Sequence, residues 1–175
     1  MSVEVTTLNS GLRIATDYNG NIETASVGVW VAVGTRHEKP EFNGISHFLE
    51  HLAFKGTQRR TALAIAEEIE AVGGHLNAYT SRENTAYFAK VLKEDINLAV
   101  DIISDILQHS TIETDELERE RQVVIQEIHQ AFDTPDDIIF DYFQKTAYPN
   151  QAIGRPVLGE ASLIATLPRK NIIDY

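Results

Sequence analysis

The most informative stretch of this chain is His47-Phe48-Leu49-Glu50-His51. Successive helical residues are rotated by about 100°, so His47, Glu50 and His51 fall on one side of a helix. The opposite side is apolar and comprises Ile45, Phe48, Leu49 and Leu52. The stretch therefore predicts a helix with one face for a hydrophobic core and the other face for chemistry.

The polar face has the donor atoms of a zinc site. A catalytic zinc takes three protein ligands and keeps one open position, so two histidines leave the site one ligand short. Glu50 is placed to act as the general base that takes a proton from a zinc-bound water. The order H-x-x-E-H occurs in zinc peptidases, which makes a zinc peptidase the leading hypothesis. The alternative is two exposed histidines on an ordinary amphipathic helix.

Composition limits the possible partners. The chain has 175 residues, 43% hydrophobic and 23% charged, which is enough for one sizeable core and predicts one domain. Its net charge of -11 opposes nonspecific binding to nucleic acid or anionic membranes and favours basic peptides. The absence of cysteine excludes thiolate ligands, so any zinc must be held by histidine and carboxylate groups.

The two ends of the sequence carry further expectations. The N-terminus lacks a basic and apolar leader, and no stretch approaches the roughly 18 apolar residues of a membrane span. A cytoplasmic bacterial protein fits this pattern, with the mature mitochondrial matrix as the alternative. The last residues, Asp174-Tyr175, follow a helical pattern with no cap or closing strand. Residues 1–175 are therefore expected to be a single α+β domain that is incomplete at its C-terminus.

Periodicity predicts an α+β fold in which a mixed or antiparallel sheet packs against several helices. Strands are predicted at residues 3–8, 12–17, 25–35, 75–80 and 85–92. Beyond the motif, helices are predicted at 61–72, 94–108, 114–132, 135–146 and 160–166, with another start at 168. Two local features add detail: Ser110-x-x-Glu113 resembles a capping box, and Trp30 is expected to anchor the core.

The predicted helix 114–132 carries two carboxylates near its buried side. Glu120 and Glu127 are seven residues apart and almost eclipsed, and they border an apolar stripe that contains Val124. The alternative interpretation is a solvated acidic edge, because Glu113, Asp115, Glu116 and Glu118 lie on the same helix or at its start.

At this point the sequence resembles the inverted-motif zinc peptidases, the family of pitrilysin, insulinase and the mitochondrial processing peptidases. That family has a ligand glutamate about 76 positions after the H-x-x-E-H motif, and here 127 − 51 = 76. Stretches 44–57 and 73–85 look most like the processing-peptidase β-type branch and its small bacterial relatives. The resemblance implies one zinc ion held by His47, His51 and Glu127, with Glu50 as general base and Glu120 as a supporting catalytic carboxylate.

The resemblance also implies a substrate site. The family binds an extended peptide along the sheet edge that corresponds to Leu76, Asn77, Ala78 and Tyr79, as an added strand. Asp137 and Asp141 match acidic positions that receive an arginine near the cleavage site in processing peptidases. A plain solvated acidic face at these two residues remains the alternative.

The resemblance finally implies partners. Complete family members close two halves around the substrate, so a second half, from the same chain, a homodimer or a heterodimer, is expected. The predicted activity is that of a zinc endopeptidase acting on extended or presequence-like peptides. The competing hypothesis is a non-catalytic structural or substrate-presenting subunit, or an inactive fragment that lacks the partner half.

Overall fold

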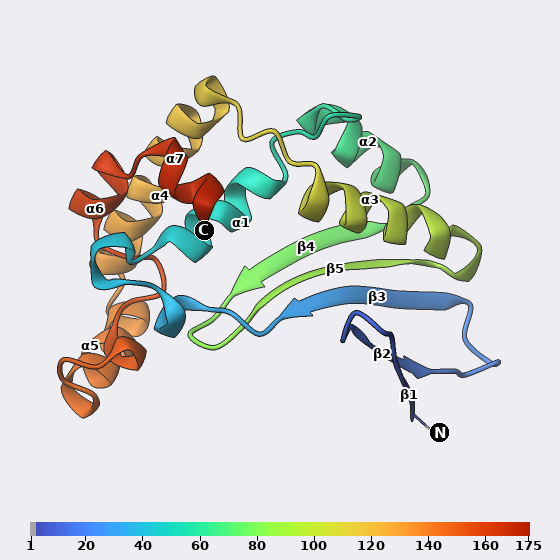
Figure 1. Cartoon of the computed structure of the whole chain (residues 1–175), viewed down its shortest axis with the longest axis horizontal. Helices are drawn as coiled ribbons and strands as arrows, with labels where there is room; N and C mark the ends of the chain where they lie inside the picture. Colours follow the sequence, from blue (N-terminus) through green and yellow to red (C-terminus); the bar gives the residue numbers. More distant parts are fainter. Residues whose placement is uncertain (1–2) are drawn as a thin grey trace.

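A three-stranded antiparallel sheet lies at the centre of the computed structural model, which describes residues 3–175. Its strand order is β3 (Thr24–Val31), β5 (Thr85–Leu92) and β4 (His75–Thr80), so β4 is an edge strand. Because side chains alternate between the faces of a strand, one face of this sheet collects the apolar residues. Figure 1 shows the sheet running beneath the helices.

Two helices cover the apolar face of the sheet. They are α2 (Ala62–Ala71) and α3 (Ile96–Gln108), and Figure 1 shows both above the strands. Their inward residues join those of β5 in a first core cluster, which contains Ala53, Ile65, Ile69, Tyr87, Ala89, Val91, Ala99, Ile102, Ile103 and Ile106.

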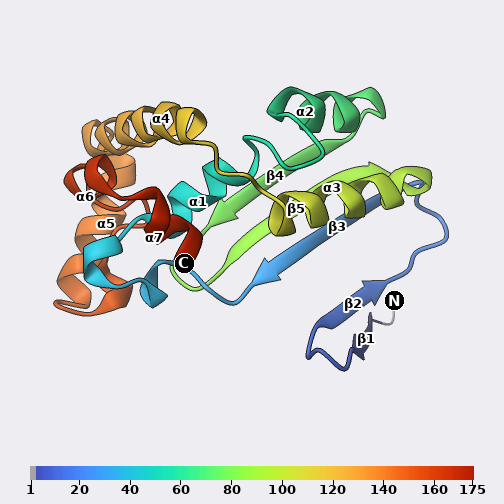
Figure 2. The same ribbon diagram turned by 45° about the horizontal axis from the view of Figure 1, so that its top comes forward.

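A second core cluster lies among helices from distant parts of the chain. It joins α1 (Ile45–Ala53) to α4 (Thr114–Asp133), α6 (Ala161–Thr166) and α7 (Arg169–Asp174), and Figure 2 shows these helices gathered at one end of the sheet. Its buried members are Ile45, Phe48, Leu52, Ile112, Leu117, Val124, Ile164, Leu167 and Ile172. Helix α5 (Pro135–Ala147) extends from α4 and buries none of its residues fully.

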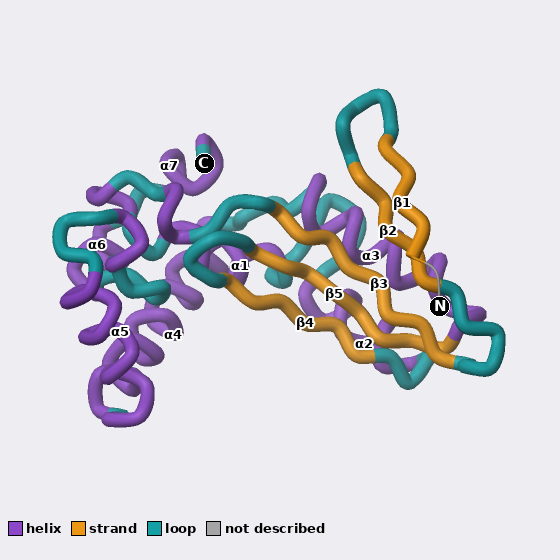
Figure 3. Tube along the Cα trace, turned by 90° about the horizontal axis from the view of Figure 1, so that it is seen from below, coloured by secondary structure: helices purple, strands orange, loops and turns teal. Residues whose placement is uncertain are grey.

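The remaining elements are short. Strands β1 (Val3–Thr7) and β2 (Arg13–Asp17) form a separate antiparallel hairpin, which Figure 3 shows projecting beside β3. The same view shows the face of the three-stranded sheet that no helix of residues 3–175 covers. Single 3₁₀ turns occur at Thr35–His37, Pro40–Phe42, Lys93–Asp95 and Ala152–Gly154.

Most of the predicted elements are confirmed, and three details are wrong. The third strand ends at Val31 rather than at residue 35. Ser110 does not cap α4, because its hydroxyl donates to the carbonyl oxygens of Leu52 and Gly56 instead. Trp30 is 61% exposed rather than a core anchor. It lies on the uncovered face of the sheet, where its indole N–H donates to the Tyr79 hydroxyl at 3.3 Å.

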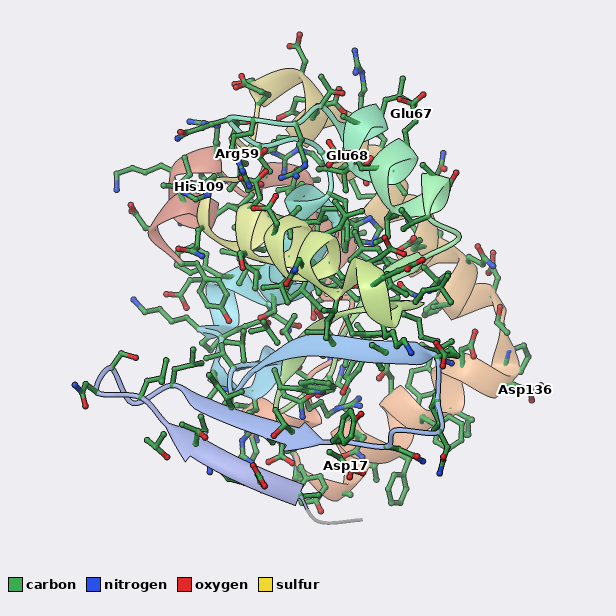
Figure 4. The ribbon with its side chains drawn as sticks, turned by 90° about the vertical axis from the view of Figure 1, so that its right-hand side faces the viewer. Asp17, Arg59, Glu67, Glu68, His109 and Asp136 are labelled. Atoms are coloured by element: carbon green, nitrogen blue, oxygen red, sulfur yellow. The ribbon has the colours of Figure 1, made fainter. Side chains whose placement is uncertain are left out.

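A buried carboxylate ties the loop after α1 to helix α3. Asp105 is fully buried and accepts hydrogen bonds from Thr57 Oγ1 at 2.7 Å, Arg60 Nη1 at 3.0 Å and Arg59 Nε at 3.1 Å. Its Oδ1 also lies 3.3 Å from His109 Nδ1, and Figure 4 shows Arg59 and His109 at the same end of the molecule. Because both oxygens of this carboxylate accept hydrogen bonds, its burial is tolerated.

The pKa of Asp105 makes this cluster testable. Burial raises that pKa, but the hydrogen bonds from Thr57, Arg60 and Arg59 outweigh burial and hold it at about 2, below its ordinary 3.8. A depressed folded-state pKa contributes stability above pH 3.8, and this contribution is lost as the pH falls toward 2.

We therefore expect Asp105→Asn to lower the free energy of unfolding at pH 7 by about 2 kcal/mol or more. Urea unfolding followed by circular dichroism measures the difference, which should shrink as the pH falls from about 4 to about 2. Asp17→Asn, at an exposed position of β2, is the control and should change little. A pH-independent difference between Asp105→Asn and the wild type would contradict the ionic account.

Candidate metal centre

The orientation of α1 follows from its buried residues. Phe48 and Leu52 have no exposed surface and pack into the second core cluster. His47, Glu50 and His51 consequently lie on the other side of the helix, as the sequence predicts. The side chains of His47 and His51 are 12% and 19% exposed, so most of each ring is covered by the protein.

The start of α1 depends on Glu38, a residue that the sequence analysis did not single out. The Glu38 carboxylate is buried and accepts from the backbone N–H groups of Gly44 at 2.8 Å and Ser46 at 2.9 Å, and from Asn43 Nδ2 at 2.8 Å. A carboxylate at this end satisfies free N–H groups and interacts favourably with the positive end of the helix dipole. Glu38 lies six residues before Gly44, too far upstream for a local capping signature to reveal it.

Three side chains converge where the metal site is predicted. His51 Nε2 lies 3.3 Å from Glu127 Oε2, and His47 Nε2 lies 3.6 Å from the same oxygen. One ligand atom from each of the three residues falls within 4.8 Å of the others. Ligands of a tetrahedral zinc at about 2.0–2.1 Å are separated by roughly 3.3 Å, so this spacing fits zinc.

The electrostatic state of His47 also fits a metal. Burial, and to a smaller extent the charge of the neighbouring His51, lower the pKa of His47 to about 4. His47 is therefore neutral at pH 7, which is the form that donates a lone pair to zinc. Its Nδ1 is buried and has no hydrogen-bond partner among residues 3–175. The Glu127 side chain is 40% exposed, so the three donor atoms face an open side.

Glu120 links the second histidine to a lysine. Glu120 Oε2 lies 3.1 Å from His51 Nδ1, and its Oε1 lies 2.8 Å from Lys55 Nζ. A carboxylate at Nδ1 holds the proton there and directs the Nε2 lone pair toward the Glu127 side. Lys55 supplies the positive charge that compensates this buried carboxylate, a role that the sequence did not indicate.

Glu50 lies beside the three converging side chains and contacts the sheet. Burial raises the pKa of Glu50, and Glu127 raises it further, whereas the hydrogen bond from Thr80 and the charge of His51 lower it. A raised pKa brings a carboxylate closer to the value at which it both accepts and returns a proton near neutral pH. The Thr80 hydroxyl donates to Glu50 Oε2 at 2.5 Å, and Thr80 was absent from the predicted site.

The predicted substrate strand is the free edge of the sheet. The Ser81 N–H donates to the Asn84 carbonyl directly opposite, so these two residues form a hydrogen-bonded pair. Hydrogen-bonded and non-hydrogen-bonded pairs alternate along antiparallel strands, so every second residue of β4 before Ser81 has its N–H and C=O on the outer side. The backbone groups of Leu76, Ala78 and Thr80 therefore point away from β5. On this outer edge, Asn77 Oδ1 accepts from the Ala78 N–H at 2.8 Å. Tyr79 projects on the uncovered face and is 43% exposed.

The two predicted arginine-binding aspartates have different surroundings. Asp141 is half-buried on α5, and its Oδ1 accepts from Arg82 Nη2 at 2.7 Å. Asp137 is exposed in the first turn of the same helix. Asp141 is thus already paired within the chain, so an incoming arginine would have to share it with Arg82 or displace Arg82.

Comparison with known families accounts for most of the chain. The sequence profile described as Insulinase (Peptidase family M16) matches residues 13–161. The chain belongs to the insulinase family of peptidases. The converging side chains His47, His51 and Glu127 all lie within the part that matches.

Several members of the insulinase family are similar over nearly the whole chain. A probable mitochondrial-processing peptidase subunit beta of Arabidopsis thaliana is 47% identical over 98% of the chain, and the human subunit beta is also 47% identical over 98%. The uncharacterized zinc protease YmxG of Bacillus subtilis is 44% identical over 97%. The crystal structure of a protease from Helicobacter pylori superposes with a TM-score of 0.93 over 99% of the chain, at 28% identity.

These relatives are much longer than the chain. It spans 32% of the Arabidopsis protein, 35% of the human protein, 41% of YmxG and 42% of the Helicobacter chain. An inactive insulinase-family domain from Pseudomonas fluorescens has the same fold at a TM-score of 0.91 but only 13% identity. Among the described residues 3–175, no helix is long and apolar enough to span a bilayer.

Removing the third candidate ligand tests the metal site. We expect Glu127→Gln to weaken zinc binding about 10-fold or more, because an amide oxygen carries no charge toward the cation. The purified chain is stripped with a mild chelator, reloaded with one equivalent of zinc, and its bound zinc is measured by atomic absorption.

The matched control is Glu67→Gln, because Glu67 is exposed on α2, near the top of the molecule in Figure 4, and is not one of the three converging residues. It should bind zinc as the wild type does. Equal zinc content in the wild type and in Glu127→Gln, with both folded, would contradict the three-ligand arrangement.

Proposed function

We propose that this chain carries the catalytic site of a zinc endopeptidase that hydrolyses bonds within extended peptides. One observation carries the proposal: His47, His51 and Glu127 converge around one point, and Glu50 lies between the two histidines on helix α1. Membership of a peptidase family and the similarity to a zinc protease support this function.

Each residue of the candidate site has a separate role in the proposed hydrolysis. His47, His51 and Glu127 would hold the zinc ion, which would supply the Lewis acid for the scissile carbonyl and for the attacking water. Glu50 accepts the proton of the attacking water and later delivers it to the leaving amine nitrogen. Glu120 keeps the proton of His51 on Nδ1, and Lys55 compensates the charge of Glu120.

The free edge of β4 supports an extended peptide as the substrate. Outward-pointing backbone groups at residues 76, 78 and 80 can pair with a peptide in an added strand without strong demands on its sequence. An incoming strand has to displace the Asn77 side chain from the Ala78 N–H. The net charge of -11 and the acidic pair Asp137 and Asp141 favour peptides with basic residues. Arg82 weakens this preference at Asp141 because it already occupies one carboxylate oxygen.

The chain spans only part of the length of its relatives, and those relatives suggest which partners and which cellular compartment to expect. We infer that residues 1–175 form one α+β domain of a larger catalytic assembly, in which a second half closes over the exposed side of the site. Subunit names among the relatives support a second polypeptide as one source of that half. Bacterial cytoplasm and mitochondrial matrix are both compatible with the relatives, which come from both kinds of source.

Substitution of the general base tests the mechanism. We expect Glu50→Gln, made in the protein at the full length that its gene encodes, to retain zinc but lower kcat/KM by about 10²- to 10⁴-fold. The reason is that glutamine keeps the shape of glutamate but accepts no proton. Cleavage of a quenched fluorescent basic peptide measures the rate, and atomic absorption measures the zinc.

Glu70→Gln, on the exposed side of α2, is the matched control and should cleave at the wild-type rate. Two outcomes would contradict the proposal. Unchanged turnover in Glu50→Gln would show that Glu50 is not the general base. A wild-type protein that binds zinc but cleaves no peptide would favour the hypothesis of a non-catalytic subunit.

A further inference from the structure

Thr80 makes a contact with the candidate general base that the proposed mechanism leaves unused. Its Oγ1 donates to Glu50 Oε2 at 2.5 Å, across 30 residues of sequence. Among residues 3–175, no other side chain hydrogen-bonds to Glu50. This bond joins α1, which bears the zinc-site histidines, to the last residue of β4, the predicted substrate strand.

The contact restricts a side chain that is otherwise free to turn. A glutamate has three rotatable side-chain bonds, and within the described chain the carboxylate of Glu50 accepts no other side-chain hydrogen bond. A hydroxyl bonded to a carboxylate forms a short and strong hydrogen bond. With Oε2 held by Thr80, Oε1 remains available to accept a proton. Thr80 is β-branched, so its own χ1 rotamer is also restricted.

We propose that Thr80 is a positioning residue that holds Glu50 in the orientation needed for proton transfer, and that it couples this orientation to the peptide-binding edge. The inference rests on the proposed function. The backbone groups of Thr80 point to the outer edge, and its side chain points to α1. A peptide that pairs with this edge is therefore held in register with the carboxylate that acts on it.

The neighbouring threonine shows what a purely structural hydroxyl does in the same hairpin. Thr85 lies opposite Thr80 in the register of β4 and β5, and it is buried. Its hydroxyl donates to the Val33 carbonyl at 3.0 Å and is not hydrogen-bonded to Glu50. Thr85→Val therefore provides a matched control, because it removes one hydroxyl from the same hairpin without removing a hydrogen bond to Glu50.

The test compares Thr80→Val, Thr80→Ser, Thr85→Val and Glu50→Gln in the protein at the full length that its gene encodes. Valine matches the shape of threonine but has no hydroxyl, whereas serine keeps the hydroxyl. We expect Thr80→Val to lower kcat about 10- to 100-fold on the fluorescent peptide, with KM within about threefold of the wild type. Zinc content should not change, and Thr80→Ser should recover most of kcat. Thr85→Val should lower the Tm but keep the wild-type kcat.

The outcomes separate the two proposals. A wild-type kcat in Thr80→Val, together with an inactive Glu50→Gln, overturns the role of Thr80 and leaves the peptidase mechanism standing. Full activity in Glu50→Gln overturns both. If Thr80→Val loses zinc or melts earlier in proportion to its loss of kcat, or if Thr80→Ser fails to recover, Thr80 is a structural residue and the inference is wrong.

Discussion

Burial of the apolar face of α1 is the constraint on which the candidate site depends. Phe48 and Leu52 are fully buried among helices from the C-terminal half. Their burial contributes about 3–6 kcal/mol together, so a rotation of α1 that exposed them would be strongly unfavourable. That rotation would also bury Glu50 without a partner. The same packing therefore holds the helix in place and turns His47 and His51 toward Glu127 on α4.

Four carboxylates lie on or next to helix α1, and the partners of each one determine whether it is structural or available for chemistry. Glu38 is saturated by N–H groups at the start of α1, and Glu120 is shared between His51 and Lys55. Glu50 receives one hydroxyl and is partly desolvated. Glu127 is the most exposed of those contacting the histidines and has no lysine or arginine within salt-bridge distance in the described chain. A carboxylate without a lysine or arginine partner among residues 3–175 is thus the one that faces the two imidazoles.

Local patterns predicted most elements because the pattern and the tertiary environment agree. Strands β4 and β5 were predicted at their observed bounds, since their alternation matches a sheet with one covered face. Trp30 shows where this approach fails. Alternation along β3 separates its two faces correctly, but only the position of α2 and α3 decides which face is covered. Ser110 fails for a similar reason, because carbonyl groups of the α1 region, distant in sequence, compete for its hydroxyl.

The sequence by itself determined the amphipathic helix, the pair of histidines with a glutamate between them, and the α+β class, because these follow from spacing along one element. The roles of Glu127 and Glu120 came only from the resemblance to the inverted-motif zinc peptidases, whose spacing these two residues match. Only the tertiary structure brought Glu38, Lys55 and Thr80 to these residues and paired Asp141 with Arg82. Such contacts join separate elements, and no periodicity records which side chains meet when a sheet edge, a loop and a helix pack together.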